Sequence, residues 1–307
     1  MAKRGWIRTG GLLLLTIGLL FAGCRKETRK ENAGMTENLT QLPLPDVPAE
    51  ITEPSERAEY MIMHYWEPMD FRDTLRAYDE GFMAQSFVNF VSLFEFADTT
   101  VRQQGARMLL KQAQADTVAY EKLTELIDRY LYDLDSPMLS EENYIPFLQA
   151  MVADPFPGET AGENAAITLS EVMKNRPGSV AADFVYERSD GKKASLHSTA
   201  APGELMLIFY DPDCDRCQAY FDKITNDEVV TQHIKNQELT VLAIYSGPNR
   251  EEWKSKRDEL PQDWIVGYEP GEIDRQELYV IRATPTIYLL SGPDKKVLIK
   301  DMFYNTK

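Results

Sequence analysis

The sequence predicts a two-domain α+β protein, in which an all-helical domain precedes a domain with a central mixed sheet flanked by helices. Residues 53–175 repeat apolar side chains at spacings of three and four, which is typical of helices packed on one another. Residues 177–307 instead alternate short apolar runs with helical segments. The length of 307 residues, 43% of them hydrophobic, is enough for two buried cores.

Charge and composition exclude several classes of function. The chain has 33 Lys and Arg against 49 Asp and Glu, a formal net charge of −16, and no basic cluster in its folded part. Nucleic acid is therefore not an expected partner. Three cysteines are too few for a disulfide-stapled scaffold. Because His64, His197 and His233 lie far apart in sequence, we expect no metal site.

Residues 1–23 have the pattern of a lipoprotein signal peptide. Basic residues precede an apolar run that is too short to span a bilayer comfortably. The run ends in Phe21-Ala22-Gly23-Cys24, which resembles the lipobox of bacterial lipoproteins, although Phe21 replaces the usual leucine. We expect lipidated Cys24 to anchor the protein in the lipid bilayer, at the periplasmic face of a bacterial membrane, with the outer membrane favoured over the inner. An ordinary secretory signal is the alternative.

Residues 24–52 are predicted to be a flexible tether between this anchor and the folded domains. They mix charged residues, Asn, Thr and prolines without helical or strand periodicity. A flexible chain of this length spans roughly 25 to 30 Å, which would hold the folded part just off a lipid surface.

The helical domain, 53–175, shows three apolar stripes. They run through Tyr60, Met61, His64 and Tyr65, then Phe87, Phe90, Val91 and Phe94, then Leu123, Leu126, Ile127, Tyr130 and Leu131. His64 lies on the first stripe, so we interpret it as a packed core histidine and not as a ligand or base.

The second domain, 177–307, reads as a βαβ half followed by a β-hairpin. Strands are predicted at 181–188, 205–210, 239–245, 286–290 and 297–300, a short extended piece at 264–268, and helices at 213–226, 249–259 and 274–280.

The candidate catalytic site is Cys214-Asp215-Arg216-Cys217, which follows the predicted strand 205–210 and opens a helix. Two cysteines three apart at a helix start face the same side and can close a disulfide within one turn. The helix dipole favours the thiolate form of Cys214. A zinc site and an inert structural disulfide remain alternatives, although no second cysteine pair exists to complete four zinc ligands.

The second domain resembles the exported thioredoxin-like proteins of the TlpA and ResA type. The likeness rests on Ala182-Asp183-Phe184, the Cys214-x-x-Cys217 pair and Ala283-Thr284-Pro285-Thr286, and covers about 177–303. In that family the proline is cis and its loop lies against the cysteines. The helical domain, with His64-Tyr65-Trp66 and Asp70-Phe71, is similar to a domain of unknown function that precedes thioredoxin-like domains in lipoproteins of anaerobic Gram-negative bacteria.

The resemblance implies a thiol-disulfide oxidoreductase, a reductase or isomerase of exported proteins. Cys214 would attack a substrate disulfide and Cys217 would resolve the mixed disulfide, with Thr284 and Pro285 seating the substrate backbone. The partners would be thiols and disulfides of exported proteins and a membrane or periplasmic electron donor. No cofactor is expected beyond the redox-active disulfide Cys214–Cys217. The rival is a non-enzymatic binding lipoprotein that uses the fold as a scaffold.

Two features depart from the family pattern. Asp213 stands where an aromatic residue usually precedes the first cysteine, and Asp211, Asp213 and Asp215 oppose thiolate formation while Arg216 favours it, which leaves the direction of the Cys214 pKa shift open. Asp211 also occupies the threonine position that peroxiredoxin chemistry needs. Because the sequence ends at Lys307, directly after the hairpin, we expect the helical domain to cover the sheet face of the usual terminal helix, unless the chain is truncated.

The lipobox generates the first prediction. The wild-type protein should label with palmitate and partition into detergent, whereas Cys24→Ala should do neither, because the thiol that carries the lipid is gone. Radiolabelling and phase partitioning measure both. A Cys24→Ala variant that still labels and fractionates with membranes would contradict a lipid anchor at this position.

Overall fold

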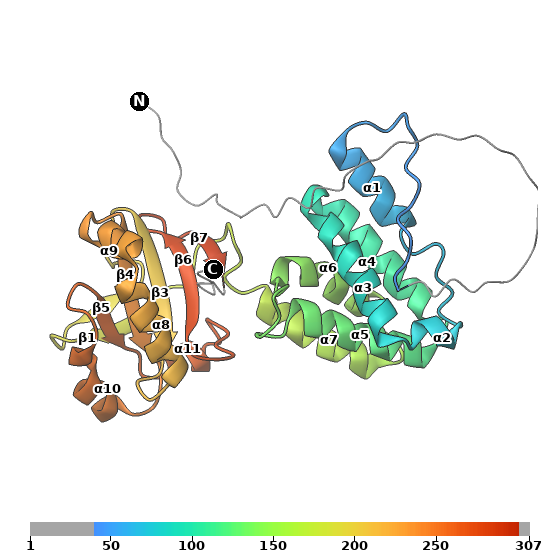
Figure 1. Cartoon of the computed structure of the whole chain (residues 1–307). Helices are drawn as coiled ribbons and strands as arrows, with labels where there is room; N and C mark the ends of the chain where they lie inside the picture. The colour runs from blue at the N-terminus through green and yellow to red at the C-terminus, as the bar shows by residue number, and fades with distance from the viewer. Residues whose placement is uncertain (1–39, 301–307) are drawn as a thin grey trace, which may run out of the picture. The chain divides into compact units, whose positions relative to one another are not determined.

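The computed structural model describes residues 40–300 (Figure 1), and residues 1–23 and Cys24 lie outside this range. Its first part is all helical, and its second part is a sheet with helices, as the sequence predicts. The helices of the first part are α1 (Pro54–His64), α2 (Thr74–Ala77), α3 (Glu80–Ser92), α4 (Thr99–Ala113), α5 (Thr117–Leu131), α6 (Glu141–Ala153) and α7 (Glu159–Val172), with a 3-10 helix at Leu93–Phe96.

Short polar residues set where these helices begin. The side chains of Asp79, Asp98, Asp116 and Ser140 each accept a hydrogen bond from a backbone N–H three residues on, at the start of α3, α4, α5 and α6. Such caps satisfy N–H groups that have no partner within the helix.

Aromatic side chains fill the core of the helical part. Phe87, Phe90, Phe94 and Phe147 are fully buried, and the rings of Phe94 and Phe147 stack at 5.9 Å. A Cβ on Gly105 would lie 2.4 Å from the Ile62 side chain, so this glycine allows α1 and α4 to approach closely. The stripe positions in α3 and α5 thus form one core with α1, α4 and α6.

The structure corrects two sequence expectations in this part. His64 is not a core residue: its side chain is 38% exposed, and Nδ1 lies 2.6 Å from Glu67 Oε1, because the ring stands at the end of α1. Leu42, assigned to the tether 24–52, is 1% exposed and packs in the helical core. One anchored residue in an irregular segment leaves no periodicity to detect.

A hydrogen bond holds the segment around Leu42 in place. The Leu42 N–H donates to Ser86 Oγ at 2.9 Å, and the same hydroxyl donates to the Phe82 carbonyl in the previous turn of α3 at 2.7 Å. Ser86 is fully buried. The hydroxyl therefore satisfies a backbone N–H that burial has removed from water.

The described residues of the second part contain one seven-stranded mixed sheet in the order β2-β1-β5-β4-β3-β6-β7. The strands are β1 (Val185–Arg188), β2 (Lys193–Ser195), β3 (Glu204–Tyr210), β4 (Leu239–Tyr245), β5 (Ile265–Tyr268), β6 (Thr286–Ser291) and β7 (Val297–Lys300). Central β3 pairs parallel with β4 and antiparallel with β6. The continuous apolar run of β3 matches this position, since it is buried on both faces.

Helices cover one face of this sheet. They are α8 (Asp215–Asn226), α9 (Glu228–Lys235) and α10 (Arg250–Lys256), whose buried residues Phe221, Val230 and Trp253 pack with those of β3, β4 and β5. The sequence did not predict α9 as a separate helix. Asp227 ends α8 and caps α9, its side chain accepting from the N–H groups of Val229 and Val230.

The core of the opposite face is formed by the same domain, while the helical domain, which we expected to cover part of the sheet, contacts this domain at Arg282 and Lys300. Its core contains Phe184, Leu196 and Tyr279 together with Leu205, Leu207 and Phe209 of β3, and no residue of the helical part belongs to it in the range 40–300. The extended entry segment and the chain around α11 (Glu272–Arg275) provide this cover. Helix α11 is shorter than the predicted 274–280, and β2 was not predicted.

None of the helices within the described range is both long and apolar enough to cross a membrane.

The Ser86 contact gives a stability prediction. Replacing Ser86 with Ala leaves the Leu42 N–H buried without an acceptor, so the free energy of unfolding should fall by about 1 to 3 kcal/mol. Urea unfolding followed by circular dichroism measures it. The matched control is Ser170→Ala, which removes an exposed hydroxyl bonded within α7 and should change stability by less than about 0.5 kcal/mol. Equal effects would show that the Leu42 anchor is unimportant.

Candidate functional site

The site lies at the end of β3, where the chain turns into α8. Cys214 is the N-cap of α8, and its N–H donates to the Asp211 carbonyl at 3.2 Å. The Asp213 N–H donates to Asp211 Oδ1 at 2.8 Å, which closes the turn around Pro212. Asp211 therefore shapes the turn that presents Cys214 at the helix start.

The two cysteines differ in their environments. Both are free thiols; Cys214 is half-buried, whereas Cys217 is fully buried among apolar residues below the sheet face. The Cys217 N–H donates to Cys214 Sγ at 3.2 Å. Because a helix leaves its first N–H groups without internal partners, Cys214 sulfur takes the place of a capping oxygen.

Strand pairing brings the proline loop to the same place. Thr286, the first residue of β6, lies opposite Phe209 near the end of β3. The residues before Thr286 therefore reach the Cys214 turn, and Cys214 Sγ lies 3.4 Å from the Thr284 carbonyl oxygen. The Thr284–Pro285 peptide bond is cis, as the family resemblance implies. The structure thus brings Cys214, Cys217, Thr284 and Pro285 together.

Electrostatics separate the two thiols. Burial raises the pKa of Cys214, but hydrogen bonds from the side chains of Cys217 and Thr284 and from the N–H groups of Cys217 and Arg216 outweigh it, so the pKa of Cys214 is lowered overall. For Cys217, burial is the main cause, with the hydrogen bond to Cys214 added, and the pKa rises to about 12. As the pH rises, Cys214 is therefore the first of the two thiols to lose its proton.

The side-chain charges of Asp213, Asp215 and Arg216, which were predicted to tune Cys214, are not among the main causes of its pKa shift. Asp213 is exposed, and its carboxylate hydrogen-bonds Glu252 and pairs with Lys256 of α10, which together lower the pKa of Asp213. Asp215 and Arg216 are exposed at the helix start, and Arg216 acts on Cys214 through its backbone N–H. Sequence reasoning missed Glu252 and Lys256, because nothing in a sequence reports a contact between Asp213 and a helix some forty residues away.

Across residues 40–300, no three His, Cys, Asp or Glu side chains are placed to hold a metal ion.

Comparison with known proteins extends to both parts of the chain. Residues 23–175 match a family described as a domain of unknown function, DUF5106. No protein with a curated description matches the chain.

Among solved structures, a thioredoxin-like protein from Bacteroides caccae is 32% identical, with a TM-score of 0.77, and the match covers 85% of this chain and 94% of that one. A conserved protein of unknown function from Bacteroides fragilis is 42% identical over 42% of this chain and 93% of its own, with a TM-score of 0.40. The thioredoxin domain of a thiol-disulfide oxidoreductase from Bacteroides vulgatus is 21% identical over 41% of this chain and 89% of its own, with a TM-score of 0.34.

The Bacteroides caccae match spans the helical part as well as the sheet. This chain therefore belongs to the same family of thioredoxin-like proteins as the Bacteroides caccae protein.

Proposed function

We propose that this protein is a thiol-disulfide oxidoreductase that reduces or isomerises disulfides of exported proteins. The observation that carries the proposal is the difference between its two thiols. Cys214 is accessible with a lowered pKa, and Cys217 is buried beside it with a raised pKa. Thiol-disulfide exchange needs one thiol that readily forms the attacking thiolate, which suits Cys214. It also needs a second thiol that reacts only after the mixed disulfide has formed, which suits Cys217.

The proposed reaction transfers two electrons from the cysteine pair to the substrate. The Cys214 thiolate attacks one sulfur of the substrate disulfide, and the other substrate sulfur leaves as a thiolate. Cys217 then loses its proton and attacks Cys214 Sγ. The Cys214–Cys217 disulfide forms, and the second substrate sulfur leaves. A thiol-bearing electron donor must return two electrons before the next cycle.

The cis-proline loop is our candidate for substrate binding. Thr284 and Pro285 lie beside Cys214, directly before β6, so an extended substrate segment could pair with this backbone while its disulfide meets the sulfur. The Thr286 hydroxyl donates to the Ala283 carbonyl at 2.6 Å, which ties the loop to the start of β6.

In this proposal Cys24 carries a lipid that anchors the protein in a bacterial membrane, and the protein acts at the periplasmic face of that membrane. The support is the lipobox-like sequence around Cys24, which lies outside the described residues. A redox-active pair suits this compartment, because disulfides form and persist outside the cytosol.

A trapping experiment tests the roles of the two cysteines. Cys217→Ser should accumulate disulfide-linked complexes with exported proteins, because attack by Cys214 is retained and resolution is lost. Cys214→Ser should trap nothing, and both variants should lose turnover. Non-reducing gels with mass spectrometry identify the complexes. If neither variant traps a partner under oxidising conditions, and the wild-type chain reduces no model disulfide, the scaffold role replaces the enzymatic one.

The pH dependence of alkylation tests the electrostatics. A thiol reacts as its thiolate, so its alkylation rate rises with pH up to its pKa. In the reduced wild-type protein, Cys214 should reach half of its maximal rate at a lower pH than an ordinary cysteine in an unfolded peptide does. Cys217, with a pKa of about 12, should stay unmodified through pH 9. Peptide mapping after iodoacetamide distinguishes the two sites. Faster alkylation of Cys217 would reverse the assigned roles.

A further inference from the structure

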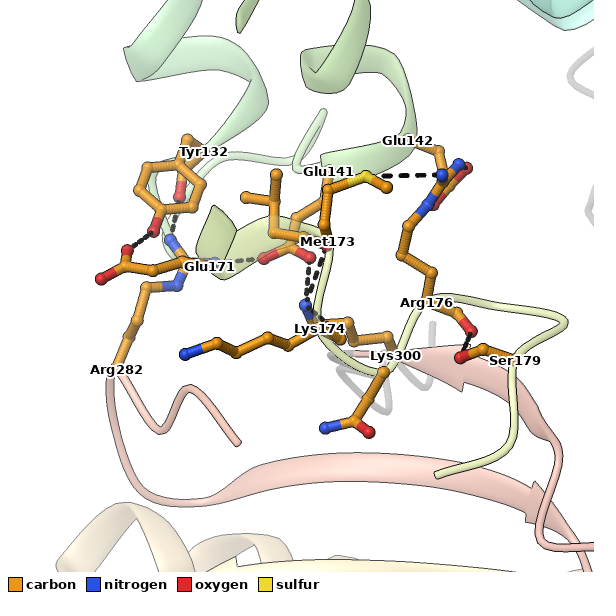
Figure 2. A network of polar contacts seen from close by, with 12 residues as sticks. Tyr132, Glu141, Glu142, Glu171, Met173, Lys174, Arg176, Ser179, Arg282 and Lys300 are labelled. Carbon is orange, nitrogen blue, oxygen red and sulfur yellow. Dashed lines mark hydrogen bonds and ion pairs between the residues drawn. The ribbon is translucent and has the colours of Figure 1, made fainter. Parts of the chain in front are cut away.

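Arg282 connects the cis-proline loop to the helical domain. It lies two residues before Thr284 and reaches the Tyr132 carbonyl, to which Nη1 donates at 2.5 Å (Figure 2). The guanidinium carbon also lies 3.9 Å from the centroid of the Tyr132 ring. Its side chain is 19% exposed, so solvent weakens these contacts little.

The helical domain offers Arg282 the negative end of a helix. Tyr132 follows Leu131, the last residue of α5, and its carbonyl belongs to the group that a helix leaves without internal donors. A cation at this end is favoured by the helix dipole. Tyr132 is itself held, since its ring stacks on Tyr144 at 5.2 Å and its hydroxyl donates to Glu171 Oε2 at 3.3 Å.

Glu141 links Arg282 to a second cation. Glu141 is the first residue of α6; its Oε1 lies 3.7 Å from Arg282 Nη2 and its Oε2 lies 2.5 Å from Lys300 Nζ. The side chains of Glu141 and Lys300 are only 11% and 6% exposed. A carboxylate this buried needs paired cations, because removing it from water is costly.

Lys300 makes a second contact between the β6–β7 strand pair and the helical domain. It ends β7 and lies opposite Tyr288 of β6. Its ammonium group donates to the carbonyls of Val172 at 3.4 Å and Lys174 at 3.0 Å, at the end of α7. Two cations of the thioredoxin-like domain therefore meet the C-terminal ends of two helices, α5 and α7, with Glu141 between them (Figure 2).

We propose that Arg282 is a positioning residue through which the helical domain holds Thr284 against Cys214. Only Ala283 separates Arg282 from Thr284, and the two residue steps span at most about 7 Å, so a shift of the guanidinium moves the loop that contacts the sulfur. The inference deepens the proposed function, on which it rests, by giving the helical domain a role in setting the reactivity of the thiol. A hydrogen bond from the Thr284 side chain to the Cys214 sulfur is one cause of the lowered pKa of that thiol, so moving the loop away from the sulfur raises the pKa.

The test uses the purified full chain carrying Cys24→Ala, so that Cys214 and Cys217 are its only thiols. Arg282→Gln removes the cation, and Glu141→Gln removes its partner from the helical side. Arg282→Lys keeps the positive charge but lacks the planar guanidinium group, whose separate N–H groups reach Tyr132 and Glu141 at the same time. The matched control is Arg176→Gln: Arg176 pairs with Glu142, the neighbour of Glu141 on α6, with Nη2 2.6 Å from Oε2 (Figure 2).

Two readouts are measured: the pH midpoint of Cys214 alkylation and the equilibrium of the cysteine pair with a glutathione buffer. Arg282→Gln and Glu141→Gln should raise the midpoint by about half a unit, roughly a threefold loss of thiolate below it. Both should also shift the equilibrium toward the disulfide, because the reduced thiolate is less stabilised. Arg282→Lys should give a smaller change, and Arg176→Gln none.

Wild-type midpoints in folded Arg282→Gln and Glu141→Gln proteins would overturn the inference, as would an equal change in Arg176→Gln. Should near-UV circular dichroism show that Arg282→Gln does not fold, Glu141→Gln and Arg282→Lys decide the outcome. The midpoint does not depend on turnover. If the wild-type chain reduces no disulfide while the variants still shift the midpoint, the proposed function fails and the positioning role stands.

Discussion

The pairing of β3 with a strand on each side is the constraint on which the site depends. Parallel pairing with β4 leaves the end of β3 free to turn into α8, and antiparallel pairing with β6 brings the chain before Thr286 back to that end. Cys214 and Thr284, seventy residues apart, therefore meet at one edge of the sheet. In this register Phe209 lies opposite Thr286, and both strands are buried along almost their whole length.

From this placement follows the asymmetry of the two thiols. Cys214 stands at the start of α8, where N–H groups that have no partner within the helix donate to its sulfur. Cys217 lies one turn further on, inside the core. Local hydrogen bonds and burial, and not the surrounding carboxylates, set the direction of both pKa shifts. The acidic residue before the first cysteine is paired with Lys256 and hydrogen-bonded to Glu252, so its charge is partly compensated within the same surface.

Among residues 40–300, the contacts of the helical domain with the thioredoxin-like domain include charged groups at helix ends. Its aromatic core is closed on itself, and the sheet is covered on both faces by residues of its own domain. Polar contacts join the two parts, among them those of Glu141 with Arg282 and Lys300 and the hydrogen bond from Asn175 to the Leu278 carbonyl. Because desolvation can offset the attraction within a buried ion pair, the effect of this network is better sought in the position of the proline loop than in the stability of the chain.

The sequence by itself determined the division into a helical and a mixed part, the strand that precedes Cys214, the helix that Cys214 opens, and the spacing that puts both thiols on one side of α8. These features depend on periodicity and on neighbouring residues, which a sequence displays directly. Only the tertiary structure decided that Leu42 is anchored on Ser86, that Lys256 pairs with Asp213, and that Arg282 meets Tyr132 and Glu141. Each is a contact between distant segments, and side-chain pairing across such separations leaves no periodic pattern in the chain.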